Sequence, residues 1–459
     1  MPSKLSRFKS LSLGAVIFGV PSFVLARAPF FGPHPWLVLS GVLSAGAFFR
    51  FYNRPAESSG IRPIVGHLSL FHVALGVVLA WTLVLLGGHW RYHRAEARVA
   101  ASGLRPAWPE DDEQNQSDRN GQMFFVRLAD QPLFALGFTT KHGATSVEED
   151  IQSALDAAAG RSTGLGTLLE RLKRRRAVWR PALDALNRAE AAPDFSWNIQ
   201  YSVPLNKIAA SPTDTLLMVV RGACAEALLQ EAAGHDGDAT LILRQAQWLG
   251  EQLRQQPRLS AVLASQAMER MIHDAATPLY RRGRGSVLLQ RALTGKDDGG
   301  LPQALAFELC YGPADAHAYP PLAQRSLLYQ PWLDWDLAAS LDAGQQALAC
   351  LNQAAPDCNS CFQAVYAPAI QQGWTLQAQT AQAAAAAQAF NTLVQARQQL
   401  ARLSYQAGRY KKAHHRWPHG PSDLKSLERV KDPRTGRPFL YKRYDEHLLL
   451  DEGELRVKL

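Results

Sequence analysis

The chain has 459 residues, enough for two or three domains, and its 49 Lys and Arg against 40 Asp and Glu give a net charge of +9. The basic residues are scattered and several flank apolar segments, so the charge does not predict nucleic-acid binding. Ala, Gln, Leu and Arg dominate the middle and C-terminal parts, which favours helices over sheets.

Three apolar segments lie within residues 1–95. The segment 68–90 contains no Asp, Glu, Lys or Arg and is long enough to cross the roughly 30 Å of a bilayer core as a helix. Shorter apolar runs at 11–26 and 36–49 precede it, so we predict a membrane segment with three transmembrane helices. The alternatives are a cleaved signal peptide for the first run and a buried core helix for the third.

The orientation of this membrane segment follows from the Lys and Arg residues beside it. Six of them flank the segments on the N-terminal side of the membrane, and five lie on the other side. Long domains translocate largely regardless of their charge, so the arginines after residue 90 count for less. We therefore predict a multi-pass protein of the bacterial inner membrane, with a cytoplasmic N-terminus and a large periplasmic domain.

An acidic, amide-rich stretch at 96–121 has the composition of an exposed linker. Its cluster Asp111, Asp112 and Glu113 lacks the ligand spacing of a calcium loop. A mostly helical soluble domain is predicted over 122–400. It begins with two aromatic-rich runs at 123–140, which predict a small β-hairpin.

Helix signals dominate the chain from residue 146 onward. Ser146 and Glu149 have the spacing of a capping box, and Pro181 predicts a break in the helical pattern of 165–186. The basic run 173–176 is interpreted as a solvated turn of a helix, with a grip on anionic lipid as the alternative. Turn residues divide 213–282 into three helices, which predicts a helical bundle or solenoid-like layer.

Two further stretches complete the helical domain. The Tyr- and Trp-rich stretch 302–335 is interpreted as a buried loop region, with an aromatic ligand surface as the alternative. An Ala- and Gln-rich helix follows over 375–403, and its small side chains predict close packing against a neighbouring helix.

The cysteines are interpreted as structural. Cys310, Cys350, Cys358 and Cys361 are candidates for disulfide bonds in an exported domain, with the pairing left open. Cys358 and Cys361 form a CxxC pair, but no βαβ pattern surrounds it, and the histidines at 414, 415 and 419 complete no zinc-finger spacing. We predict no metal site and no cofactor.

No motif in the sequence predicts a catalytic site. Residues 160–164 read GRSTG and match the letters of a nucleophile elbow, but a helix rather than a strand precedes them. His235 and Asp236 fall in a turn between helices, where such residues usually serve as turn and cap residues. We assign no catalytic residue, and the sequence favours a non-enzymatic role.

The C-terminal segment 401–459 is predicted to form a small α/β unit. Pro418 ends a helix, Ser422 caps a short helix over 422–427, and Asp432, Pro433 and Gly436 form a turn before a strand. Phe439 and Tyr441 share one face of this strand, with Leu448 and Leu450 on its hairpin partner.

This segment resembles the C-terminal part of type II secretion pseudopilins and of uncharacterised bacterial membrane-anchored envelope proteins. The resemblance rests on Arg416, Trp417 and Pro418 and on the stretch DPRTGRPFLY at 432–441. The chain lacks the pseudopilin processing site ahead of a single hydrophobic helix, and it lacks the acidic calcium-binding end. By fold analogy, the resemblance implies the same small α/β unit.

The sequence as a whole predicts a membrane-anchored envelope protein, mainly α-helical, whose outer domain binds another envelope protein. Its partners would be the lipid bilayer and that protein, without nucleic acid, and the oligomeric state is left open. The alternative is an envelope enzyme with a pocket between 302–335 and the helical bundle. A transporter subunit is disfavoured because the predicted membrane helices carry no Asp, Glu, Lys or Arg.

Overall fold

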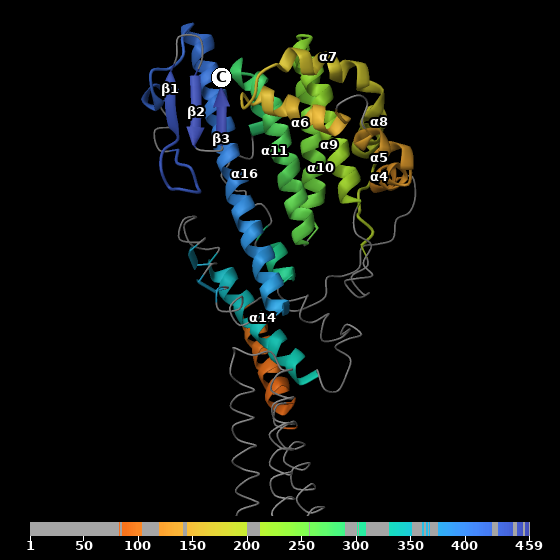
Figure 1. Cartoon of the computed structure of the whole chain (residues 1–459), viewed down its shortest axis with the longest axis vertical. Helices are drawn as coiled ribbons and strands as arrows, with labels where there is room; N and C mark the ends of the chain where they lie inside the picture. The colour runs from red at the N-terminus through yellow and green to blue at the C-terminus, as the bar shows by residue number, and fades with distance from the viewer. Residues whose placement is uncertain are drawn as a thin grey trace, which may run out of the picture. The chain divides into compact units, whose positions relative to one another are not determined.

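A computed structural model describes residues 85–102, 119–140, 145–199, 212–256, 258–289, 303–308, 330–350, 375–424, 430–443, 448–452 and 455–458, with a few single positions between them. Within these ranges the chain is mainly helical, as the sequence predicts (Figure 1). The chain divides into two compact units. The first contains 1–107, 309–347 and 361–383, and the second contains 108–308, 348–360 and 384–459.

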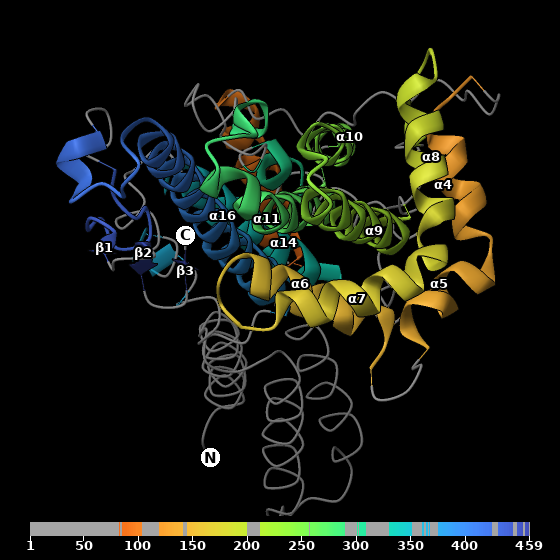
Figure 2. The ribbon, with the colours of Figure 1, turned by 90° about the horizontal axis from the view of Figure 1, so that it is seen from above.

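Three consecutive helices form the centre of the second unit, and they confirm the division predicted for 213–282. They are α9 (Thr213–Ala232), α10 (Asp236–Arg254) and α11 (Leu259–Arg281), and each contacts the other two (Figure 2). Gly234 takes a positive φ of 83° in the turn between α9 and α10. The N-cap position of α9 is Pro212, and no side chain caps this helix end.

A second set of helices packs against α9. Helix α6 (Val147–Ala158) begins at the predicted capping box: the Glu149 N–H donates to Ser146 Oγ, and the Ser146 N–H donates to the Glu149 carboxylate. The helical pattern breaks as predicted near Pro181. Helix α7 (Leu165–Arg175) ends in the short 3₁₀ helix η1 (Arg176–Val178), and α8 (Arg180–Ala191) carries that proline in its first turn.

The predicted β-hairpin at 123–140 is wrong. The two aromatic-rich runs form helices α4 (Gln122–Ala129) and α5 (Pro132–Thr139), with Pro132 in the first turn of the second. Both contact neighbouring helices, α4 packing on α8 and α5 on α6. The β-propensity of the aromatics is overridden because an isolated pair of strands leaves backbone groups unpaired beside helices, whereas a helix satisfies them internally. The rings of Phe134 and Phe138 then meet edge to face one helical turn apart, with centroids 5.2 Å from each other.

The C-terminal part joins a long helix to a small sheet. Helix α16 (Thr375–His414) runs through residue 401, where a separate segment was predicted to begin, and the predicted helix at 422–427 is a 3₁₀ turn, η4 (Pro421–Leu424). The sheet has antiparallel strands β1 (Leu440–Arg443), β2 (Leu448–Glu452) and β3 (Leu455–Lys458) in that order. The predicted hairpin is confirmed, since Tyr441 lies opposite Leu450, whereas β3 was not predicted.

A compact apolar core joins this sheet to α16. Leu400 and Leu403 of the helix pack with Trp417, Phe439 and Leu450, all of them buried. The sheet therefore needs the helix to cover one face, since three short strands alone bury too little apolar surface.

In the first unit, residues 85–101 form a helix that packs on α14 (Gln330–Cys350). Residues 96–101, predicted as the start of a linker, belong to this helix. Arg98 forms an ion pair with Asp342, and the guanidinium of Arg91 lies 4.9 Å from the centre of the Trp335 ring. The buried contacts involve seven residues: Tyr92, Ala95, Val99, Leu333, Leu337, Ala338 and Leu341.

The predicted membrane spans at 11–26 and 36–49 lie outside the described residues, as does most of 68–90. Among the helices that the structure describes, none is both long enough and apolar enough to cross a membrane.

Candidate functional site

Helices α11 and α16 face each other with polar side chains at positions that are otherwise core. The buried polar residues of α11 include Ser265, Gln266, Glu269, His273, Asp274 and Thr277, and those of α16 include Asn391, Arg397, Gln398 and Ser404. A buried polar group without a partner costs about 1–3 kcal/mol, so each of these groups needs a contact. Gln266 donates to the Asn391 side chain at 2.7 Å, which begins the series of contacts between the two helices.

Glu269 is the centre of the first cluster. Its carboxylate accepts hydrogen bonds from Arg254 at 2.7 Å and from Gln398 of α16 at 2.5 Å, and the His273 ring lies 3.7 Å away. Burial alone raises the pKa of Glu269, but His273, Arg254 and Gln398 together lower it by more, to about 2. This carboxylate is therefore ionised at neutral pH and fully engaged with its neighbours.

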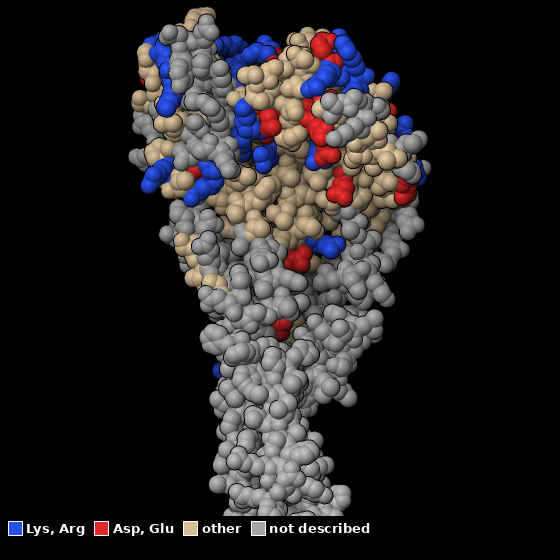
Figure 3. Space-filling model, in the orientation of Figure 1, with Lys and Arg blue, Asp and Glu red and all other residues tan. Residues whose placement is uncertain are grey.

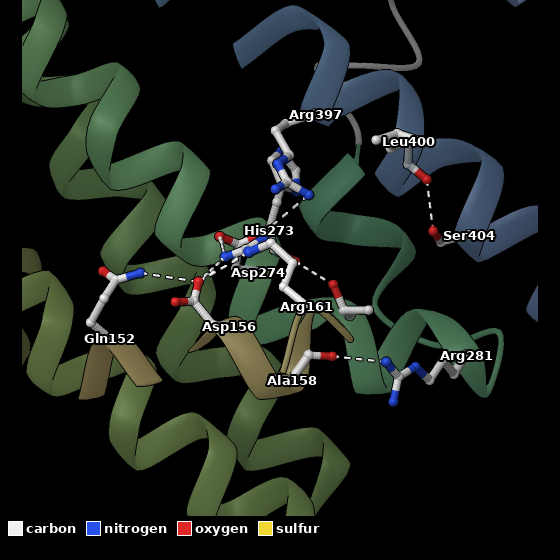
Figure 4. A network of polar contacts seen from close by, with 11 residues as sticks. Gln152, Asp156, Ala158, Arg161, His273, Asp274, Arg281, Arg397, Leu400 and Ser404 are labelled. Atoms are coloured by element: carbon white, nitrogen blue, oxygen red, sulfur yellow. Dashed lines mark hydrogen bonds and ion pairs between the residues drawn. The ribbon is translucent and has the colours of Figure 1, made fainter. Parts of the chain in front are cut away.

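Asp274 is the centre of the second cluster, shown in Figure 4. Both of its oxygens accept hydrogen bonds from Arg161 at 2.9 Å, and the same guanidinium donates through Nε to Asp156 of α6 at 3.0 Å. Arg397 of α16 approaches Asp274 Oδ1 to 3.8 Å from the other side. One buried carboxylate thus connects the turn after α6 to the long helix.

The two arginines beside Asp274 are held differently. Burial lowers the pKa of Arg161, but its hydrogen bonds to Asp274 and Asp156 raise that pKa by more, so its net shift is upward. Arg397 is only 3 % exposed, and its Nε and Nη1 have no hydrogen-bond partner. Burial and the charges of Arg161 and Arg270 therefore lower the pKa of Arg397 to about 10, against the opposing effect of Asp274.

Close backbone contact completes the junction between α11 and α16. A Cβ atom at Gly408 would overlap the carbonyl oxygen of Tyr280, and it would stand 2.8 Å from the N of Gly283. The Tyr280 hydroxyl is buried and lies 3.0 Å from His273 Nδ1. The polar network and this close approach together fix α16 against α11, which is a structural role for the cluster.

The GRSTG stretch lies in a turn, and His235 and Asp236 lie at the start of α10. Gly160 and Gly164 of the GRSTG stretch have positive φ values of 78° and 86°, and Arg161 between them belongs to the Asp274 cluster. Asp236, beside His235, forms ion pairs with Arg282 and Arg284 at the end of α11. Each motif thus contributes a charged contact between helices.

The basic run 173–176 divides between internal and exposed charges. Arg175 pairs with the buried Asp150 at 2.8 Å, and Arg176 pairs with the buried Glu226. Lys173 and Arg174 are exposed on α7. Only Arg175 is therefore largely internal, because the Arg176 side chain is itself 57 % exposed while it pairs with Glu226.

The three described cysteines fall into two groups. Cys224 is a free, buried thiol of α9, and burial raises its pKa. Cys350 and Cys361 are disulfide-bonded. Cys310 and Cys358 lie outside the described residues, so the pairing of the four candidates stays a prediction. Within the described ranges, no group of three or more His, Cys, Asp and Glu residues is arranged to hold a metal ion.

The buried network was missed at the level of the sequence, although a signal for it exists. Gln266, Glu269, His273 and Thr277 are spaced by three and four residues in an otherwise apolar helix, which marks one polar stripe. On α16, Arg397 and Ser404 are seven residues apart, which places them on the same face two turns apart.

Comparison with protein-family models, with curated proteins and with solved structures finds no match to this chain.

Proposed function

We propose that the chain is a membrane-anchored envelope protein whose helical part binds another envelope protein and catalyses no reaction of its own. The apolar segments 11–26, 36–49 and 68–90 support the anchoring. The buried charged side chains between α6, α11 and α16 pair with one another, which supports the proposal of a rigid scaffold. Placement in the bacterial inner membrane with a periplasmic domain belongs to the same proposal, and so does the likeness of 401–459 to pseudopilins.

The surface of α5 is the observation that carries the proposal of a protein partner. This helix contains no charged residue and turns Phe134 and Phe138 inward. Leu136 is 54 % exposed on the opposite face, and Phe124 of the neighbouring α4 is half-buried. Protein interfaces are depleted of charge at their centres and enriched in Phe and Met, so this uncharged edge fits a docking surface.

The test is photo-crosslinking in intact cells. A photo-reactive residue at Leu136 is compared with one at Leu241, which is equally exposed at 54 % but lies on α10. We expect a discrete protein adduct from position 136 and none from position 241. The proposal fails if neither position gives an adduct, or if both positions give the same adducts.

A pair of substitutions separates binding from folding. Leu136→Asp and Leu241→Asp both place a charge at an exposed site, so both variants should keep the helical circular dichroism of the native chain. We expect only Leu136→Asp to lose the crosslinked partner in a pull-down from solubilised membranes. Equal recovery of the partner with both variants would remove α5 from the interface.

The alternative of an envelope enzyme depends on the stretch 302–335, and most of that stretch lies outside the described residues. Nothing among the described residues specifically favours it over a binding role.

A further inference from the structure

Although the basic residues are scattered along the chain, its net positive charge arises in one segment. Residues 401–443 contain twelve Lys and Arg against three Asp and Glu, an excess of nine, which equals the net charge of +9 of all 459 residues. The rest of the chain is therefore electrically balanced. An excess of this size within 43 residues creates a local field that attracts anions.

Most of these cations lie at the surface. Among the described residues of the segment, eight Lys and Arg side chains are exposed, including Lys411 and Lys412 at the end of α16 and Lys442 on β1. The two described carboxylates are engaged elsewhere: Asp432 is buried and paired with Arg434, and Asp423 accepts the backbone N–H of His419 at 2.7 Å. Figure 3 shows blue side chains over the region that Figure 1 labels β1.

Two of these cationic side chains converge on the ring of His419. Nη1 of Arg443 lies 2.5 Å from Nδ1 of His419, and Nη1 of Arg416 contacts Nε2 of the same ring. Arg443 is the last residue of β1, and the loop that carries Arg416 and His419 is fixed from both sides. Trp417 is buried in the core of the sheet, and the Tyr441 hydroxyl donates to the carbonyl oxygen of Pro418 at 2.6 Å.

The His419 ring cannot accept hydrogen bonds from both Arg416 and Arg443. A neutral imidazole has one acceptor nitrogen, so it accepts a hydrogen bond from only one of the two guanidinium groups. If the ring is protonated, it accepts none, and three cations then face one another. Among the described residues, no carboxylate forms an ion pair with Arg416 or Arg443. An anion with several acceptor oxygens would accept hydrogen bonds from both guanidinium groups at once.

We infer that Arg416, His419 and Arg443 form a binding site for a phosphate group. Guanidinium groups match phosphate oxygens in pairs of hydrogen bonds, and a tetrahedral dianion offers enough oxygens for both arginines and the imidazole. A single carboxylate carries half that charge and has only two oxygens. The phosphate comes either from free inorganic phosphate or from the monoester headgroup of a lipid. This site lies apart from α5 and stands independently of the proposed protein partner.

The experiment is isothermal titration calorimetry, in which inorganic phosphate is titrated into the full chain in a non-ionic detergent. Chloride keeps the ionic strength constant throughout. Arg416→Gln with Arg443→Gln is compared with Lys431→Gln with Arg437→Gln. Both double variants remove two exposed charges from the same segment, but only the first removes the converging pair. We expect phosphate to bind at least tenfold more weakly to the first, and within twofold of the native affinity to the second.

Three results would overturn the inference. One is the absence of binding by the native chain at millimolar phosphate, and another is equal weakening in both double variants, which would indicate only diffuse attraction. If the glutamine pair perturbs the circular dichroism, Arg416→Lys with Arg443→Lys keeps the charge but loses the paired donors. Native affinity in that lysine variant is the third contrary result.

The source of the phosphate follows from a second titration. Dihexanoyl phosphatidic acid, used below its micellar concentration, presents a phosphate monoester on a lipid backbone. Tighter binding of this lipid than of inorganic phosphate, lost in Arg416→Gln with Arg443→Gln, assigns the site to a headgroup. Equal affinity for both ligands, with the same dependence on the two arginines, assigns it to free phosphate.

Discussion

Asp274 connects three parts of the second unit. Its two oxygens face Arg161 from the turn after α6 and Arg397 from α16, while its own backbone belongs to α11. Removing one member of a buried ion pair costs more than the pair contributes, because the partner charge is left unpaired. The two arginines beside Asp274 differ in how well they are paired. Each side-chain nitrogen of Arg161 donates a hydrogen bond to a carboxylate, whereas Nε and Nη1 of Arg397 have no hydrogen-bond partner.

We expect Asp274→Ala to destabilise the protein by about 3–5 kcal/mol, because it leaves two arginines without their shared anion. Arg397→Met removes a poorly paired buried cation and keeps an apolar chain of similar length, so it should change stability by less than about 1 kcal/mol, or stabilise. Urea unfolding followed by circular dichroism measures both. A larger loss in Arg397→Met than in Asp274→Ala would contradict the assignment of Arg161 as the main partner.

Glu269 predicts the response to acid. Its pKa in the folded chain is about 2, below its ordinary value of 4.5, so the unfolded chain binds more protons between these values. The stability that this group contributes is therefore complete above about pH 4.5 and is lost as the pH falls towards 2. Unfolding curves between pH 5 and 2 should show this loss in the native chain, and Glu269→Gln should flatten it. An identical acid profile in the two proteins would refute the role of Glu269.

At the scale of elements, the sequence signals worked where local chemistry decides the outcome. The capping box at Ser146 and the break before Pro181 depend on neighbours within four residues, and both were predicted correctly. The hairpin at 123–140 failed because the aromatic residues there satisfy either a strand or a helix, and packing on α6 and α8 decides between them. The contacts between α11 and α16 join residues more than 120 positions apart, which no local pattern encodes.

Gly408 provides the sharpest test of the junction between these two helices. A Cβ at this position meets backbone atoms of Tyr280, Arg281 and Gly283, which have no side-chain freedom to move away. We expect Gly408→Ala to destabilise the protein by about 1–3 kcal/mol through overpacking.

Gly166 of α7 is the matched control, because nothing lies within 4 Å of its added Cβ. Gly166→Ala should be neutral or stabilise by up to about 1 kcal/mol through helix propensity. Thermal unfolding of the two variants distinguishes them. Equal changes in the two melting temperatures would mean that α16 does not approach α11 closely at Gly408.

At the scale of the whole molecule, the state of the cysteines bears on the proposed compartment of the large domain. Cys350 and Cys361 are disulfide-bonded and Cys224 is buried, so none of these three offers a free thiol to solvent. Disulfide bonds persist in oxidising compartments such as the periplasm. Their presence agrees with the proposed orientation of the large domain.

Thiol labelling in intact cells checks this orientation. With a membrane-impermeant maleimide, we expect no labelling of the native chain until a mild reductant opens the disulfide bonds. Cys224→Ser should leave the result unchanged, because that thiol is buried. Thiols that react only after lysis, without any reductant, would place the large domain in the cytoplasm.

The burial of α11 has a consequence for how the second unit opens. Eighteen of the 23 residues of α11 are buried, and other helices cover it along its length. Amide hydrogens at its centre therefore exchange with solvent only when the surrounding helices separate, which is the slowest class of exchange in a protein. In deuterium-exchange experiments, the central peptide of α11 would report the free energy of opening of the entire unit, while the peptides of α5 would report local fluctuations.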